Sequence, residues 1–152
     1  MRELDDPLNA RVHAYITHGL TAAEREWPRF ANTFRDVGEL SINELNTHPD
    51  LGDRLRDLMP AGAEWGIIAC CNVLRARNGV VFALARGMDH LYFRCGMTPL
   101  ATIAGANLTA ELGPDWHGVN AWQSAFGTKE TLHLHRDLCV VAHEHALALT
   151  TD

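Results

Sequence analysis

The chain has 152 residues, of which 47% are hydrophobic and 21% are charged, a composition typical of a folded globular protein and not of a disordered or fibrous one. This length favours a single domain spanning residues 1–152. Nineteen acidic residues outnumber thirteen basic ones, which gives a formal net charge of −6. Because nucleic-acid binding draws most of its affinity from neutralising phosphates, this charge argues against a DNA or RNA partner and mildly for a basic protein partner.

The sequence also predicts a cytoplasmic protein that is not associated with a membrane. Its opening, MRELDDPLNARV, carries charges where a signal peptide needs an apolar run, and no window approaches the roughly 18 apolar residues of a membrane span. The cysteines form neither a CxxC pair nor the framework of a secreted protein, so we expect reduced and mostly buried thiols. They are Cys70, Cys71, Cys95 and Cys139.

The first 60 residues carry the pattern of helices. Asp6 can cap a first helix, and Pro7 suits its first position. A capping box predicts a second helix over residues 21–37. Asp50 can cap a third helix over residues 51–59.

From residue 64 the pattern changes to one that is typical of strands. Asn78-Gly79 between β-rich runs is the strongest short hairpin signal in the chain, and Gly87-Met88 can form a second tight turn. These turns predict a three-stranded antiparallel meander over about residues 64–95.

Two-residue turns would place Leu84 opposite both Val73 and Leu91. One face of the meander then collects the bulky side chains of Trp65, Ile67, Val73, Phe82, Leu84, Leu91 and Phe93. The other face carries the smaller or polar residues Cys70, Asn72, Ala76, Ala83, Ala85, His90 and Tyr92. We expect helices to cover the bulky face.

A further helix is predicted over residues 99–112, where Thr98 can act as the cap and Pro99 as the first residue. Helices that precede and follow an antiparallel meander in the sequence make an α+β domain. The pattern leaves helix or strand open for residues 116–149.

The stretch LHLHRDLCVVAHEHA, residues 132–146, contains four of the nine histidines. Its alternation favours a strand at the start. A single helix over residues 128–149 would instead place His135, Cys139 and His143 on one face, at a spacing that can hold zinc through two or three ligands. The candidate ligands for zinc or another transition metal are His133, His135, Cys139, His143 and His145. The alternative interpretation is that these histidines are structural.

Two known metal motifs begin in this region, and neither is complete. HEHAL starts like the zinc-protease helix motif, but Leu147 occupies the position of its second histidine. Gly127 followed by His133 and His135 starts like the first cupin motif, without the glutamate that should come next. No family is assigned on this basis.

Arginines near the strand ends could bind a carboxylate or a phosphate. They are Arg75, Arg77, Arg86 and Arg94. Solvated arginines at the rim of the sheet are the simpler interpretation. Asp115 and His117 are acid and imidazole neighbours of the kind a general base uses, but this pattern is not specific.

Without a nucleophile or nucleotide-binding motif, we expect a non-catalytic protein that binds another protein, such as an inhibitor, an immunity-type antitoxin or a chaperone-like adaptor. One alternative is a metal-binding protein or metal-dependent enzyme that uses the C-terminal histidines. The other is a small-ligand-binding module with a pocket around His90, Tyr92 and Arg94, between the sheet and helix 99–112. The sequence leaves the oligomeric state, the partner and any substrate open.

Overall fold

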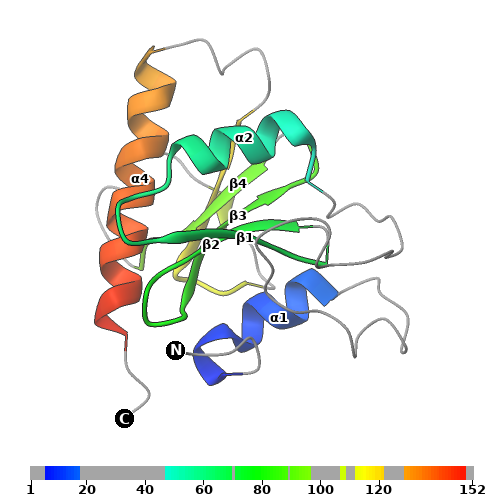
Figure 1. Cartoon of the computed structure of the whole chain (residues 1–152), viewed down its shortest axis with the longest axis vertical. Coiled ribbons are helices and arrows are strands. Elements are labelled where there is room, and N and C mark those ends of the chain that lie inside the picture. Colours follow the sequence, from blue (N-terminus) through cyan, green and yellow to red (C-terminus); the bar gives the residue numbers. More distant parts are fainter. Residues whose placement is uncertain are drawn as a thin grey trace.

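The computed structural model combines helices with one antiparallel sheet (Figure 1). It describes residues 6–17, 47–69, 71–88, 90–96, 107–108, 112–121 and 129–149. The α+β class expected from the sequence is confirmed in these ranges. No helix among them is long and apolar enough to cross a membrane.

The early helices begin close to where the sequence predicts them. The Asp6 carboxylate caps the first one, accepting a hydrogen bond from the Leu8 N–H at 2.9 Å. The next described helix is capped by His48 and not by the predicted Asp50, because Pro49 takes the first helical position. The helical elements of the described ranges are η1 (Pro7–Asn9), α1 (Ala10–Thr17), α2 (Pro49–Asp57) and α4 (Lys129–Ala148).

Two of the predicted helices fall largely on residues that the structure does not describe. The helix expected over residues 21–37 lies outside the described ranges. Of the one expected over residues 99–112, Asn107 and Leu108 form a strand, so that prediction is wrong at these positions. They pair with Gly118 and His117, and this long-range pairing overrides the local helical pattern.

The described strands form one sheet, with the order β1-β2-β3-β4-β6-β5. The predicted three-stranded meander is therefore wrong, since residues 64–95 alone supply four strands. The first strand of the predicted meander is divided by a turn at Ala69, whose φ of 47° is left-handed. No Gly, Pro or Asn marks that turn in the sequence. The strands are β1 (Glu64–Ile68), β2 (Cys71–Arg75), β3 (Val81–Arg86), β4 (His90–Arg94), β5 (Asn107–Leu108) and β6 (Trp116–Asn120).

The register between strands is predicted correctly on one side of β3 and wrongly on the other. Leu84 lies opposite Val73, as expected, but it also lies opposite Tyr92 and not Leu91. The cause is that three residues, and not two, separate the paired ends of β3 and β4 at Arg86 and His90. Because side chains alternate along a strand, this one extra residue moves every side chain of β4 to the opposite face.

A β-bulge between β2 and β3 also changes the predicted faces. Leu74 pairs with Ala83 while the next residue, Arg75, pairs with Val81, so Phe82 is the extra residue. Phe82 consequently lies in the same core cluster as Phe93, whereas Leu84 lies in the opposite cluster. The separation into one bulky and one small face is therefore wrong, because large side chains occupy both.

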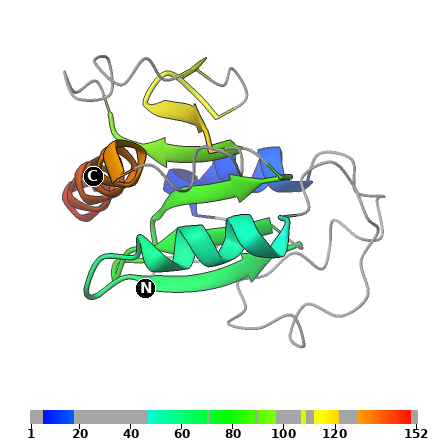
Figure 2. The same ribbon diagram turned by 90° about the horizontal axis from the view of Figure 1, so that it is seen from above.

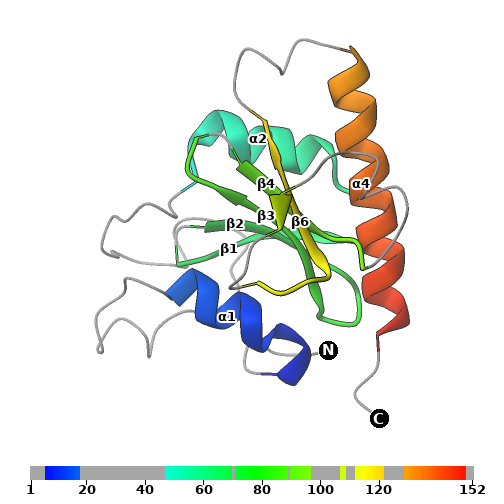
Figure 3. The ribbon, with the colours of Figure 1, turned by 180° about the vertical axis from the view of Figure 1, so that it is seen from behind.

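Helices cover both faces of the sheet (Figure 2). On one face, α2 and α4 pack against Phe82, Leu91 and Phe93. On the other face, α1 packs against Leu84 and Tyr92, and Figure 3 shows α1 and α2 on opposite sides of the strands. Packing on both sides explains why so few sheet residues in the described ranges reach the surface.

Asn9 attaches the N-terminal helical segment to the sheet. Its side chain is 1% exposed, donates a hydrogen bond to the Gly79 carbonyl at 2.9 Å and accepts one from the Val81 N–H at 2.9 Å. The amide thus pairs with the backbone of the β2–β3 hairpin as a neighbouring strand would. This contact fixes where η1 and α1 meet the sheet.

Replacing Asn9 by Ala should lower the free energy of unfolding by roughly 2–4 kcal/mol, because a buried donor and a buried acceptor both lose their partner. Asn9→Asp, which keeps the acceptor for Val81 but places a buried carboxylate oxygen against the Gly79 carbonyl, should be at least as destabilising at neutral pH. Urea unfolding followed by circular dichroism measures both. An Asn9→Ala midpoint equal to that of the wild type would contradict this role.

Candidate functional site

The predicted metal ligands lie on α4, so the helix alternative is correct and the strand alternative is wrong. His135, Cys139 and His143 occur on successive turns of one face. Their environments differ, however, since His135 is 1% exposed and Cys139 is fully buried, whereas His143 is half-buried. His133 faces solvent. The helix therefore does not present them as one accessible group.

The two buried members of this set carry no charge at neutral pH. Burial, together with Arg54, lowers the pKa of His135 to about 4, and its Nδ1 has no hydrogen-bond partner among the described residues. Burial, together with Cys95, raises the pKa of the Cys139 thiol to about 12. The protonated thiol, and not the thiolate, is therefore the form of Cys139 present at neutral pH without a bound metal.

The other two histidines of α4 pack on the sheet. The His143 ring lies 5.0 Å from the Phe82 ring between centroids. The His145 ring lies directly against Gly96, where a Cβ atom would be only 2.9 Å from the His145 Cε1 atom. Among the described residues, no group of three or more His, Cys, Asp or Glu side chains is placed to hold a metal ion. The metal site stays a prediction.

The three residues predicted to form a ligand or partner surface lie on one side of β4, but they do not act together. The His90 ring stacks on Tyr92 at 5.9 Å, and Tyr92 meets the edge of Tyr15 from α1 at 6.1 Å. Tyr92 is only 6% exposed, so α1 covers this part of the strand. Arg94, at the far end of β4, enters a different environment.

Arg94 is the centre of a polar cluster between α1, β4, β6 and α4. Its Nε donates to the Asp115 Oδ2 atom at 2.8 Å, and its Nη1 donates to the Leu8 carbonyl at 2.6 Å. The same Oδ2 atom lies 4.0 Å from the His145 Nε2 atom. Burial lowers the pKa of His145, while Asp115 acts in the opposite direction. The neutral imidazole of His145 thus lies next to the ion pair of Arg94 and Asp115.

The sequence does not reveal this cluster, because its members are far apart in the chain. The sequence suggests a pair of Asp115 with its neighbour His117. In the structure, the His117 Nε2 atom bonds to the Gly96 carbonyl at 2.9 Å. The interpretation of solvated rim arginines is wrong for Arg94 and Arg75. Their side chains are 14% and 11% exposed, and Arg75 is paired with Glu64 at 2.8 Å.

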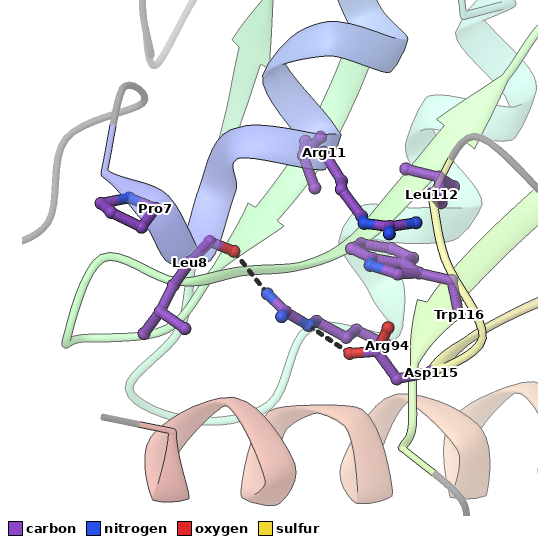
Figure 4. Close-up of a pocket in the computed structure, with 8 residues that line it drawn as sticks. Pro7, Leu8, Arg11, Arg94, Leu112, Asp115 and Trp116 are labelled. Carbon is purple, nitrogen blue, oxygen red and sulfur yellow. Dashed lines mark hydrogen bonds and ion pairs between the residues drawn. The ribbon is translucent and has the colours of Figure 1, made fainter. Parts of the chain in front are cut away.

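A pocket of about 160 Å³ lies beside this cluster, between the N-terminal helical segment and the start of β6 (Figure 4). Arg94 and Asp115 form part of its wall, and Arg11 enters it from α1. Figure 4 shows the Arg11 guanidinium extending toward Trp116 and Leu112, and the Arg94 guanidinium lying between the Leu8 carbonyl and the Asp115 carboxylate. The full lining is Pro7, Leu8, Arg11, Val12, Arg94, Leu112, Asp115 and Trp116.

Arg11 was not singled out from the sequence, although it is the charged group with the greatest freedom at this site. It is exposed and forms no ion pair with any other residue in the described ranges. Its guanidinium lies over Gly113, where a Cβ atom would be 2.9 Å from the Arg11 Nη1 atom. In the sequence, Arg11 is a single arginine on the polar side of a helix, and its neighbours do not indicate that it lies beside a pocket.

A scan against protein-family models, a search of curated proteins and a search of solved structures each found no match. The site is therefore interpreted from its own geometry.

Because the pKa of His135 is lowered from 6.5 to about 4, the unfolded chain binds a proton there before the folded one does. This residue should thus decrease the free energy of unfolding by roughly 3 kcal/mol as the pH falls from 6.5 to 4, with no further effect below pH 4. In His135→Leu, the free energy of unfolding, measured with urea, should fall less between pH 6.5 and pH 4. His133→Leu, an exposed change on the same helix, should retain the wild-type slope, and equal slopes in both variants would contradict the assignment.

Proposed function

We propose that this protein is a small-ligand-binding module whose ligand occupies the pocket between α1 and β6. The observation that carries this proposal is the pocket itself. It combines apolar walls with a few charged groups that converge on one space, which is the usual composition of a small-molecule site. The sequence predicts such a module around His90, Tyr92 and Arg94, and of these three residues Arg94 lines the pocket.

The size of the pocket limits the ligand. Its volume of about 160 Å³ is close to the roughly 150 Å³ of an engineered protein cavity that holds benzene. It is well below the roughly 300–1,000 Å³ of pockets that take drug-sized molecules. We therefore expect a compact ligand of about six to ten non-hydrogen atoms.

The walls of the pocket are held in place before any ligand arrives. Val12, Leu112 and Trp116 are at most 1% exposed, so they form part of the packed core. Arg94 is fixed by its hydrogen bonds to Leu8 and Asp115. A site built from groups that are already ordered loses little conformational entropy on binding.

Binding to another protein remains an alternative proposal, and it rests on the net charge of −6. The exposed large hydrophobic residues of the described ranges are Met59, Met88 and Val140, which lie after α2, between β3 and β4, and on α4. Since they are on three separate segments, they give this alternative less support than the pocket gives to ligand binding. Recovery of no partner above background in a pull-down from the native host would count against it.

A metal-dependent function stays open as a prediction for the histidines of α4. Metal analysis of protein purified without an affinity tag tests it. Less than about a tenth of an equivalent of zinc or another transition metal per chain would rule it out for the purified protein.

Small aromatic fragments should bind at the pocket in an NMR screen. The largest shifts are expected for the backbone amides of Val12 and Leu112 and for the indole N–H of Trp116. Leu8→Trp, which adds a large side chain to the pocket wall, should abolish these shifts because it occupies the ligand volume. Met88→Trp places the same side chain at an exposed position and should bind fragments normally.

One-dimensional proton spectra and thermal unfolding establish that both variants are folded. Fragment shifts that persist in folded Leu8→Trp, or that are scattered over the sheet, would show that the pocket is not the binding site.

A further inference from the structure

We infer that the pocket takes a ligand with one carboxylate group, which the guanidinium of Arg11 binds while the apolar walls hold the rest of the molecule. This inference rests on the proposed function, because it names the class of ligand for the same site. It is derived from the balance of charge around the pocket, the packing of Arg11 and the chemistry of the remaining wall.

Among the described residues, the charged groups that line the pocket leave one positive charge without an ion-pair partner. Two arginines and one aspartate contribute to the wall. Arg94 is paired with Asp115 at 2.8 Å, so these two neutralise each other. Arg11 remains, and it forms no ion pair with a described residue. A cationic site in a chain with a net charge of −6 is a local exception to its overall electrostatics.

The side chain of Arg11 lies close to the backbone at Gly113. Its Nη1, Cδ and Cζ atoms would lie 2.9, 3.2 and 3.4 Å from a Cβ atom at residue 113. A side chain at residue 113 would displace the end of the exposed Arg11 side chain, and the φ of +112° at Gly113 also favours glycine. The arginine is therefore packed against the backbone, and its planar donor groups are available for a carboxylate.

Asp115 restricts the charge that the ligand can carry. Its carboxylate belongs to the same wall and is 28% exposed. A second negative charge on the ligand would be placed near this carboxylate, and the described lining holds no second unpaired cation to compensate it. The arrangement thus favours a carboxylate over a phosphate or another doubly charged group.

The rest of the wall fits a hydrocarbon or a ring. Pro7, Leu8, Val12, Leu112 and Trp116 contribute apolar atoms to the lining of the pocket, beside its charged groups. Desolvating a compact apolar group against them contributes affinity, while the carboxylate fixes the orientation. A ligand with a carboxylate at one end and a small apolar body at the other satisfies both parts of the site.

The test compares four probes of nearly equal size by NMR titration at constant ionic strength and pH 8. They are benzoate, benzamide, benzylammonium and phenylphosphonate. Benzoate should bind about tenfold more tightly than the neutral benzamide, as one charge-assisted hydrogen-bonded contact predicts. Phenylphosphonate should bind more weakly than benzoate, and benzylammonium should bind most weakly.

Arg11→Gln should weaken benzoate binding about tenfold and leave benzamide binding unchanged. Arg136→Gln is the matched control, since it removes the same charge from an exposed position on α4 and should leave both affinities at wild-type values. An equal loss in the two variants would mean that the effect comes from net charge and would overturn the assignment to Arg11.

The remaining outcomes separate the two proposals. Benzamide binding as tightly as benzoate, with no effect of Arg11→Gln, would overturn the carboxylate inference and leave the ligand pocket standing. Phenylphosphonate binding more tightly than benzoate would overturn the limit to one negative charge. If no probe shifts the resonances of Val12, Leu112 or Trp116, the pocket is not a ligand site and the inference fails with it.

Discussion

The double attachment of Arg94 holds the polar end of this molecule together. Its guanidinium donates to the Leu8 carbonyl and to the Asp115 carboxylate, so one side chain of β4 connects the N-terminal helical segment with the start of β6. Such hydrogen bonds stabilise a buried charge only when its donors are paired. The position of α1, the wall of the pocket and the environment of His145 all depend on this contact.

The polar cluster exists because the sheet is covered on both faces. Helices α2 and α4 pack on one face and α1 on the other, so side chains at the ends of the strands meet residues from both layers. Asn9 attaches the α1 layer to the β2–β3 hairpin, and Gly96 lets the His145 ring of α4 approach Asp115. The pocket forms between the N-terminal helical segment and the start of β6.

The histidines that share α4 differ in how deeply each ring is buried. His135 is enclosed by the core and stays neutral, whereas His145 lies next to an acid and His133 faces water. A dense run of histidines in a sequence suggests a common role. Here the burial of each ring, set by the face of the helix on which it lies, gives them separate environments.

The sequence by itself determined the features that depend on neighbouring residues. These include the α+β class, the cap at Asp6, the hairpin at Asn78-Gly79 and the pairing of Val73 with Leu84. Local hydrogen bonding and backbone preference fix such features within a few residues. The same local rules favoured a two-residue turn after β3, and the actual turn is one residue longer, so the faces of β4 were exchanged.

Only the tertiary structure decided which distant residues meet. The turn at Ala69, the bulge at Phe82 and the strand at Asn107 have no local signal, since each is stabilised by pairing with another part of the sheet. The same holds for the candidate site. Arg11, Arg94 and Asp115 come from three separate segments, and their contacts arise from how the layers pack, which short-range pattern does not encode.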